Sequence, residues 1–344
     1  MSMPRPEPAA RCVDLPAAVD PSALSLNENP FPPLPSVQSA LIQAVGSANR
    51  YPEFLPLRMR SLIAAQIGIR DEQVVIGAGA TGVILQVLQA LTEPGDAIVL
   101  TAPTFDGYPI LAQMARLRSV TVPLNVHGHH DLDAMADAAG TARVVVLCRP
   151  HNPTGTIEPA ADVERFLHRV GTDTTVLLDE AYVEFLAPAE RVDARALVWR
   201  FPNVVVIRTF SKAYGLAGLR IGYGICAPDL GRRLWSMQLP FGTALTGLVA
   251  VAACYRAEDE LQHRIRVIGA ERRRLRAQLS RLGVYSTDAR ANFVYLPGGR
   301  PWPEVFDRAG LRVRHYADGG ARVSVGTRQS TRAVLAAVST AGLR

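Results

Sequence analysis

The sequence predicts an α/β protein, in which a mainly parallel sheet is flanked by helices and followed by a smaller α/β unit. Two observations support this. Between about residues 58 and 230, short runs that are apolar throughout alternate with stretches of helical periodicity, which is the pattern of parallel strands buried on both faces. The 344 residues, 48% of them hydrophobic and 20% charged, can form about two domains with a sizeable core.

The first 35 residues are rich in proline, which disfavours a helix, so we expect an extended N-terminal arm there. A helix is expected from Ser36 to about Val45. The expected strands of the large sheet are Gln73–Ile76, Ala97–Leu100, Val144–Leu147, Thr175–Leu178 and Val204–Arg208. Between these strands, Val83–Leu91 and Ala161–Arg169 have the spacing of amphipathic helices.

A long helix is expected over about residues 243–282, followed by the smaller unit. Its expected strands are Ala291–Leu296, Leu311–His315 and Ala321–Val325, and a closing helix starts at Arg328. We therefore divide the chain into an arm (1–35), a large domain (36–240) and a small C-terminal domain (241–344) to which the arm contributes.

Charge and cysteine content narrow the function classes. The net charge is +6, and the densest basic run is Glu271–Arg281. Leucines recur in this run at helical spacing, which favours a solvated helix face over a nucleic-acid site. Four scattered cysteines without a CxxC pair argue against a zinc site or a disulfide framework and predict a cytoplasmic protein. The apolar runs are too short to span a bilayer, and Met1–Ala10 does not resemble a signal peptide.

Lys212 is the single lysine among 37 basic residues. Arginine replaces lysine as a surface charge, but its guanidinium stays protonated and does not form a Schiff base. An amine that loses its proton attacks a carbonyl and can hold a cofactor covalently. Thr209, Ser211 and Arg220 flank Lys212, as a phosphate ester beside an imine would require. The alternative interpretation is an ordinary polar loop.

Other candidate functional residues lie at the ends of expected strands, where ligands bind in open α/β sheets. The turn Gly77–Gly82 suits a phosphate, although close packing of strand and helix explains it equally well. Asp179 ends an apolar strand, where a buried carboxylate needs a partner. The protonated pyridine nitrogen of a pyridoxal-type cofactor would be such a partner, and Tyr182 would reach the phenolic oxygen of the same cofactor ring. A helix N-cap is the alternative role of Asp179. Two prolines fix the turn that presents Asn152, a second donor to that oxygen.

Together these residues resemble the fold-type-I pyridoxal-phosphate aminotransferases, within them the histidinol-phosphate and aromatic amino acid branch. The resemblance runs from about Leu26 to Gly326. The segments that carry it are Leu26-Asn-Glu-Asn-Pro30, Arg50-Tyr-Pro52, His151-Asn-Pro-Thr-Gly155, Asp179-Glu-Ala-Tyr182, Ser211-Lys212, Gly218-Leu-Arg220 and Arg322-Val-Ser-Val-Gly326.

The resemblance implies a role for each matching residue. Lys212 would form the Schiff base and carry the proton, with Asp179 on the pyridine nitrogen and Asn152 and Tyr182 on the phenolic oxygen. Arg322 would clamp the substrate α-carboxylate, and Arg314 would lie near its distal end. The ring of Phe105 would stack on the cofactor. Tyr51 would contact the phosphate site of the neighbouring subunit, which implies a homodimer. The implied phosphate ligands within the chain are Ala80, Thr81, Thr209, Ser211 and Arg220.

Departures from the family pattern indicate the substrate. Histidinol-phosphate enzymes usually carry tyrosine at the positions of Phe31, Phe105 and Phe241. We place Phe31 and Phe241 with Asn29 in the substrate site. The loss of three hydroxyls favours an apolar pocket. The sequence therefore predicts an aminotransferase that moves an amino group between an aromatic or other apolar amino acid and a 2-oxo acid such as 2-oxoglutarate.

Alternative functions remain open from the sequence. A histidinol-phosphate aminotransferase and a decarboxylase or lyase of the same fold share these motifs. A non-catalytic regulator would need a DNA-binding domain, which the proline-rich arm is too short to form. We expect His151 to be a turn residue. The polar loop His127–Asp131 lacks a partner cluster, so we expect no metal.

Overall fold

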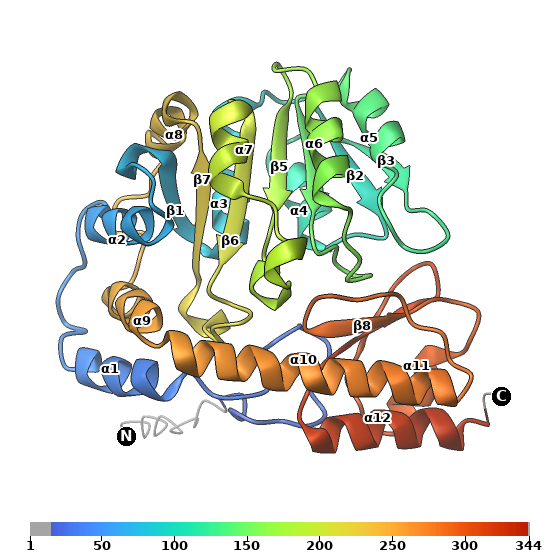
Figure 1. Cartoon of the computed structure of the whole chain (residues 1–344). Coiled ribbons are helices and arrows are strands. Elements are labelled where there is room, and N and C mark those ends of the chain that lie inside the picture. The colour runs from blue at the N-terminus through green and yellow to red at the C-terminus, as the bar shows by residue number, and fades with distance from the viewer. Residues whose placement is uncertain (1–14, 343–344) are drawn as a thin grey trace, which may run out of the picture.

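The computed structural model describes residues 15–342, and within them two sheets form (Figure 1). The strands are β1 (Val74–Ala78), β2 (Ala97–Ala102), β3 (Arg118–Pro123), β4 (Val144–Cys148), β5 (Thr175–Asp179), β6 (Val204–Thr209), β7 (Ile221–Cys226), β8 (Phe293–Leu296), β9 (Arg314–His315) and β10 (Ala321–Ser324). The helices are α1 (Pro35–Val45), α2 (Leu57–Ile67), α3 (Gly79–Leu91), α4 (Gly107–Met114), α5 (Leu132–Ala139), α6 (Ala160–Arg169), α7 (Ala194–Arg200), α8 (Pro228–Trp235), α9 (Leu245–Arg256), α10 (Glu258–Arg281), α11 (Trp302–Arg308) and α12 (Arg328–Thr340).

The large sheet has the strand order β1-β7-β6-β5-β4-β2-β3. Strands β2 to β6 are mutually parallel, and β7 is antiparallel to both β1 and β6. The predicted parallel sheet and its five predicted strands are confirmed. The carboxyl ends of β4, β5 and β6 consequently meet at one edge, where the residues that follow them come together.

Strands β3 and β7 were not predicted, for two different reasons. Strand β3 is an edge strand that is mostly exposed, so it lacks a continuous apolar run. Strand β7 is fully buried, but two glycines interrupt its apolar pattern. Gly222 is required there, because a Cβ atom would lie 2.4 Å from the backbone nitrogen of Ala80. The close approach of β7 to α3 therefore hides the strand from a hydrophobicity pattern.

Helices cover both faces of the large sheet (Figure 1). Residues along β4 alternate between two hydrophobic clusters: Val145 and Leu147 face the cluster that includes α6 and α7, and Val144 and Val146 face the cluster that includes α3 and α4. Burial on both faces explains why these strands are apolar throughout.

The predicted long helix over 243–282 is wrong in one respect, because it breaks at Ala257 into α9 and α10. Three acidic residues, Glu258, Asp259 and Glu260, occupy the first turn of α10 and stabilise a new helix N-terminus. Helix α9 contacts α1 and α2, whereas α10 extends past the small sheet to α12 (Figure 1). The helix that was expected from Ser36 begins at Pro35, a favoured first position.

The small sheet has the order β8-β10-β9 and is antiparallel. Trp302 and Phe306 of α11 pack with Leu275 of α10 in its core. The N-terminal segment joins this core through Leu24, whose backbone bonds to Arg312 and Ser324. This contact agrees with a contribution of the arm, part of which (residues 1–14) lies outside the described residues; the domain limits at 35 and 240 stay a prediction.

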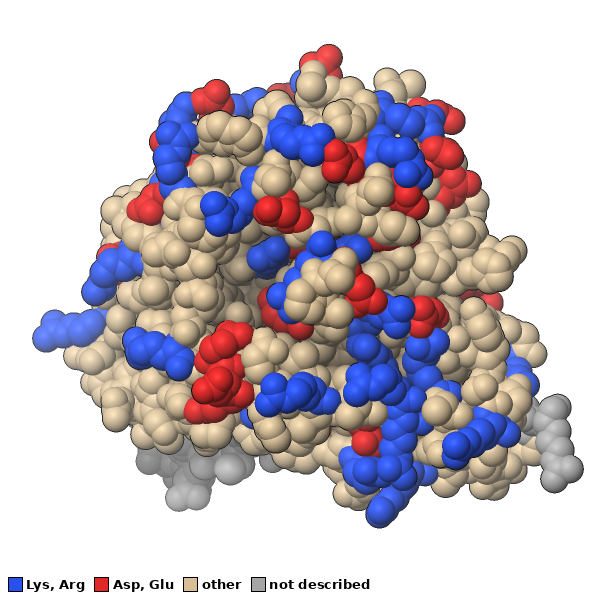
Figure 2. Space-filling model, in the orientation of Figure 1, with Lys and Arg blue, Asp and Glu red and all other residues tan. Residues whose placement is uncertain are grey.

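Arginines gather on the face that α10 crosses, interspersed with acidic side chains (Figure 2). Arg273, Arg274 and Arg281 are exposed, as expected for a solvated helix face. Arg272 instead turns inward and donates to the backbone oxygen of Ala291. Within residues 15–342, no helix is long and apolar enough to cross a membrane.

Candidate active site

A pocket of about 400 Å³ lies at the carboxyl ends of β4, β5 and β6 and is closed on its other side by the small sheet. The turn after β1, the loop before α4 and the segment Ser25–Glu28 complete its wall. The predicted site residues that line it are Ala80, Thr81, Phe105, Asn152, Asp179, Tyr182, Thr209, Ser211, Lys212, Arg220, Arg314 and Arg322.

Lys212 follows β6 and directs its amine into this pocket. Its Nζ donates to the backbone oxygen of Leu26 at 3.2 Å and lies 5.8 Å from the ring centroid of Tyr182. Removal of water by the surrounding protein, and then the positive charge of Arg322, lower the pKa of Lys212 to about 8. A larger fraction of this amine is therefore neutral near pH 7 than of an ordinary lysine, as a nucleophile requires.

Asp179 ends β5 in a buried position. Its Oδ2 accepts a hydrogen bond from the Tyr108 hydroxyl at 2.6 Å, and its Oδ1 accepts one from the Ala181 backbone N–H at 2.9 Å. Burial raises the pKa of Asp179, and these two hydrogen bonds oppose that effect. No α-helix starts at Asp179, so the N-cap alternative does not apply. Tyr108 was missed by the sequence reasoning, because it looks like a core residue of an amphipathic helix.

Tyr182 is held from the N-terminal segment. Its hydroxyl oxygen accepts from the Asn27 side-chain amide at 2.9 Å, which leaves its own proton for a partner in the pocket. Asn27 is buried, has a left-handed backbone with φ of 54° and also bonds to Ser324. Asn27 is a further residue that the sequence reasoning missed, although it lies inside the Leu26–Pro30 motif.

Arg322 joins the two sides of the pocket. From β10, its Nη1 donates to Asn152 Oδ1 and, at 2.9 Å, to the Tyr316 hydroxyl, while its Nη2 donates to the Ser25 backbone oxygen. The Nε atom of Arg322 is buried without a partner. Because the Asn152 oxygen is engaged, its amide N–H groups remain available to the pocket.

The start of α3 forms a cradle for an anion. Its N-terminal N–H groups receive no side-chain cap, and Arg220 reaches them with Nη2 3.5 Å from Thr81 Oγ1. A Cβ atom on Gly79, whose φ is +73°, would lie only 2.3 Å from the same Nη2 atom. The Thr209 hydroxyl bonds to Ser211 beside this cradle. N–H groups, hydroxyls and a guanidinium around an open space fit a phosphate group.

Comparison with known proteins agrees with this arrangement. The family model for aminotransferase class I and II matches residues 20–341. The chain belongs to the class I and II aminotransferases. An aromatic amino acid aminotransferase from Streptomyces avermitilis is 42% identical over 320 residues, with 91% of this chain and 89% of that protein covered. One from Cutibacterium acnes is 43% identical over 307 residues, with 88% and 87% covered.

A solved structure is also similar to this aminotransferase. The histidinol-phosphate aminotransferase of Sinorhizobium meliloti, in complex with pyridoxal-5′-phosphate, superposes with a TM-score of 0.86 at 28% identity. The match covers 93% of this chain and 91% of that chain. The expected fold is therefore confirmed over 93% of the chain.

Four predicted site residues of the aminotransferase do not line the pocket of the single chain: Asn29, Phe31, Tyr51 and Phe241. Substrate contact by Asn29 stays a prediction; its side-chain amide donates to the backbone oxygens of Lys212 and Ala213 and so holds the lysine turn. Phe31 packs against the core beneath Arg264. Tyr51 and Phe241 lie in contact on the surface, with ring centroids 4.8 Å apart.

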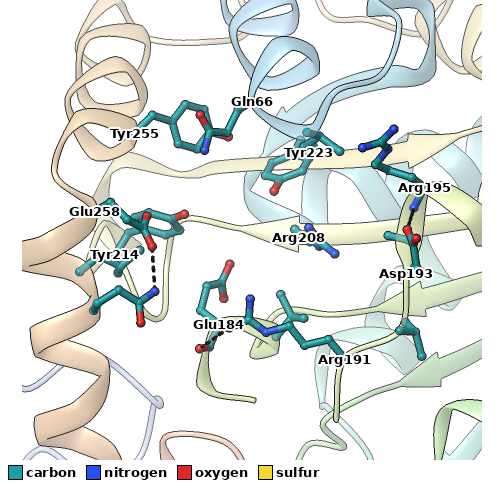
Figure 3. A pocket seen from close by; sticks show the side chains of 16 residues that line it. Gln66, Glu184, Arg191, Asp193, Arg195, Arg208, Tyr214, Tyr223, Tyr255 and Glu258 are labelled. Atoms are coloured by element: carbon teal, nitrogen blue, oxygen red, sulfur yellow. Dashed lines mark hydrogen bonds between the residues drawn. The ribbon is translucent and has the colours of Figure 1, made fainter. Parts of the chain in front are cut away.

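A second cavity, of about 350 Å³, is lined by residues close in sequence to Asp179 and Lys212, among them Glu184, Arg208 and Tyr214 (Figure 3). Arg208 donates to Glu180 Oε2 at 2.9 and 2.7 Å, and this buried pair ties the end of β5 to that of β6. Tyr214 and Glu258 lie on one side of the cavity, with Arg191 on the other. The pair positions Asp179 and Thr209, which are the chain neighbours of its two members.

His151 lies in the turn that carries Asn152 and is fully buried. Its ring nitrogens lie 3.3 Å from Thr101 Oγ1 and 2.9 Å from Thr154 Oγ1. Burial lowers the pKa of His151 well below its usual value, which favours the neutral ring. A structural role in the turn, as expected, agrees with these contacts. In the described part of the chain, no cluster of side chains could hold a metal ion.

Proposed function

We propose that this aminotransferase binds pyridoxal 5′-phosphate at Lys212 and moves an amino group between an aromatic or other apolar amino acid and a 2-oxo acid such as 2-oxoglutarate. The observation that supports it most is one pocket that combines three features: an amine with lowered pKa, a buried carboxylate and an anion cradle. When bound, the cofactor supplies an electron sink for the substrate carbon that loses its proton.

The residues that surround the cofactor would each make one contact. Asp179 would pair with the pyridine nitrogen, and Asn152 and Tyr182 would donate to the phenolic oxygen. Phe105, whose ring packs edge-on against Tyr108 with centroids 5.2 Å apart, would cover one face of the ring. The phosphate would be held by Ala80, Thr81, Thr209, Ser211 and Arg220, which border the cradle.

Lys212 would also carry the proton of the reaction. A neutral Nζ atom would accept the proton that the substrate Cα loses and would hold it within the pocket until it is handed on. The low pKa of Lys212 supports this role, since general bases work best when their pKa lies near the working pH. Asn29 would support this role of Lys212, because its side-chain amide holds the Lys212 backbone in place.

The substrate would bind between Arg322 and an apolar wall. The guanidinium of Arg322 would grip the α-carboxylate, with its unpartnered Nε as an added donor. Relatives named aromatic amino acid aminotransferases, at 42% and 43% identity, support an aromatic or apolar side chain.

A histidinol-phosphate substrate is the second candidate, because a structural neighbour carries that name at 28% identity. Half-reactions with phenylalanine, tyrosine and histidinol phosphate distinguish the two. We expect kcat/KM for phenylalanine to exceed that for histidinol phosphate at least about tenfold. Comparable values would remove the substrate assignment, and release of carbon dioxide instead of amino-group transfer would indicate a decarboxylase.

We further propose a homodimer in which Tyr51 enters the phosphate site of the neighbouring subunit. Tyr51 is 83% exposed and, with Phe54 and Phe241, forms an exposed aromatic cluster away from its own pocket. Exposed clusters of this kind mark interfaces. A cytoplasmic location is consistent with unpaired Cys148, Cys226 and Cys254, while Cys12 lies outside the described residues.

Borohydride reduction tests the centre of the proposal. The reduced holoprotein should carry the cofactor on one residue, Lys212, as read by peptide mass spectrometry. Lys212→Ala should abolish amino-group transfer. Lys212→Arg is the matched control, because it keeps the positive charge but cannot form the imine. A reduced protein without covalent cofactor would refute the assignment.

A further inference from the structure

An ion pair crosses the solvent-exposed edge of the active-site pocket. Arg314 Nη2 lies 2.9 Å from Asp106 Oδ2, and the two side chains are 47% and 45% exposed. Arg314 belongs to β9 of the small sheet, and Asp106 immediately precedes α4 beside the large sheet. Both residues line the same pocket as Lys212. The pair therefore forms part of the wall that a substrate side chain would meet.

Arg314 has a second charged neighbour in Arg322. The two residues lie directly opposite each other in the pairing of β9 with β10. Opposite residues of an antiparallel pair point to the same face, with Cβ atoms about 5 Å apart. Arg322 is buried and Arg314 is half-exposed. Two guanidinium groups side by side suit a substrate with two carboxylates, one for each fork.

Asp106 neutralises part of the positive charge that Arg314 and Arg322 present to a substrate. We propose that Asp106 is a specificity-determining residue, an internal counter-ion that occupies Arg314 until a second substrate carboxylate displaces it. This inference rests on the proposed function. An aromatic side chain then meets a neutralised wall, because the Arg314 charge is already paired. A dicarboxylate instead takes Arg314 from Asp106 while Arg322 holds its α-carboxylate.

The exposure of the pair makes such an exchange feasible. Half-exposed ion pairs contribute little stability, so a competing carboxylate with bidentate geometry can replace Asp106. Without Asp106, an apolar ring would have to desolvate a lone guanidinium, which is unfavourable. A phosphate dianion would meet both Arg314 and the like charge of Asp106. Asp106 thus disfavours a phosphorylated substrate relative to an aromatic one.

The alternative is that the pair only anchors β9 to the loop before α4. If the pair only anchors β9, breaking it should lower kcat/KM by the same factor for every substrate. Specificity predicts opposite changes for aromatic and dicarboxylic substrates. A comparison of substrates within each variant therefore separates the two roles.

The test uses the holoenzyme with Asp106→Asn, Arg314→Gln and the double variant. Asparagine keeps the shape of the side chain and removes its charge. Half-reactions with phenylalanine, glutamate and histidinol phosphate are followed by the cofactor absorbance. Asp106→Asn should raise the kcat/KM ratio of glutamate to phenylalanine about tenfold, mainly through KM. Arg314→Gln should lower this ratio about tenfold, because the unpaired Asp106 repels the second carboxylate, and the double variant should lie between them.

Asp288→Asn is the control, since it breaks ion pairs with Arg276 and Arg290 elsewhere on the surface. Equilibrium binding of glutarate and 3-phenylpropionate gives a readout that needs no turnover, and the same reversal is expected. An unchanged ratio in Asp106→Asn, or equal losses for all substrates, would overturn the inference. Wild-type holoenzyme that binds both probes but transfers no amino group would instead contradict the proposed function.

Discussion

The Tyr108 hydroxyl donates to Asp179 Oδ2 at 2.6 Å, and this bond joins α4 to the end of β5. Both groups are buried, and burial raises the pKa of each. A hydrogen bond to the charged form of a carboxylate opposes such a rise. Tyr108 therefore orients Asp179 and, together with the Ala181 backbone N–H, opposes the rise of its pKa.

Replacement of Tyr108 by phenylalanine should lower activity without unfolding the protein. Loss of a hydrogen bond to a charged group costs roughly 1.5 kcal/mol, so kcat/KM should fall about tenfold. The pKa of Asp179 should rise further, which weakens its pairing with a protonated ring nitrogen. Steady-state kinetics and the cofactor affinity measure both effects. Tyr285→Phe, at a position 58% exposed and outside the pocket, is the control and should leave both unchanged.

Cofactor capture should depend on pH through Lys212. Its pKa is lowered to about 8, first by burial and then by Arg322. Only the neutral amine attacks, so the rate of capture should rise with pH, with a midpoint near pH 8, and level off about one pH unit above it. Stopped-flow absorbance of apoprotein mixed with pyridoxal phosphate between pH 6 and 10 tests this. A midpoint near the ordinary lysine pKa of 10.5 would contradict it.

Stability should depend on pH through Glu184, which lines the cavity of Figure 3. Burial raises the pKa of Glu184 from 4.5 to about 7, so between these values the folded chain binds more protons than the unfolded chain. Its contribution to stability is present below pH 4.5 and is lost as pH rises through 7. Glu184→Gln cannot ionise and should be more stable than wild type at pH 8 by about 1–2 kcal/mol, after discount for partial exposure.

The difference between urea midpoints at pH 5 and pH 8 measures this effect at fixed protein concentration. The two proteins should be nearly equal in stability at pH 5. The same pH dependence in both proteins would show that another group is responsible.

Gly79→Ala should weaken cofactor binding by its effect on the cradle. The new Cβ would lie 2.3 Å from Arg220 Nη2, and the φ of +73° adds strain. We expect the pyridoxal phosphate Kd to rise about tenfold, measured by fluorescence titration. Gly95→Ala is a matched control, since its φ is +96° but nothing lies within 4 Å of its Cβ position. Both variants should lose roughly 1 kcal/mol of stability, and only Gly79→Ala should lose cofactor affinity.

The sequence predicted the elements whose patterns are local. Strands β4, β5 and β6 are apolar throughout because both faces are buried, and that pattern is visible without a structure. The same approach failed for β3, an exposed edge strand, and for β7, in which glycines replace apolar residues. Pairing with neighbouring strands, which no local pattern encodes, makes both segments strands.

In the candidate site, too, some residues could be predicted from the sequence and others could not. Lys212, Asp179 and Asn152 could be predicted because each follows a recognisable strand with an unusual residue type. Tyr108 and Asn27 could not, because their neighbours in the chain are ordinary and their partners lie 71 and 155 positions away. The hydrogen bond of the Asn29 amide to the Lys212 backbone was likewise not predicted, because it joins residues far apart in the chain.

The sequence by itself determined the chemistry of this protein, since a lone lysine, a strand-end aspartate and a cradle of small residues are local choices. The tertiary structure decided the supporting contacts: Tyr108 on Asp179, Asn27 on Tyr182, and Asp106 on Arg314. The physical reason is that reactivity follows from the type of a residue and its place at a strand end. Charge, orientation and specificity depend instead on side chains that folding brings from distant segments.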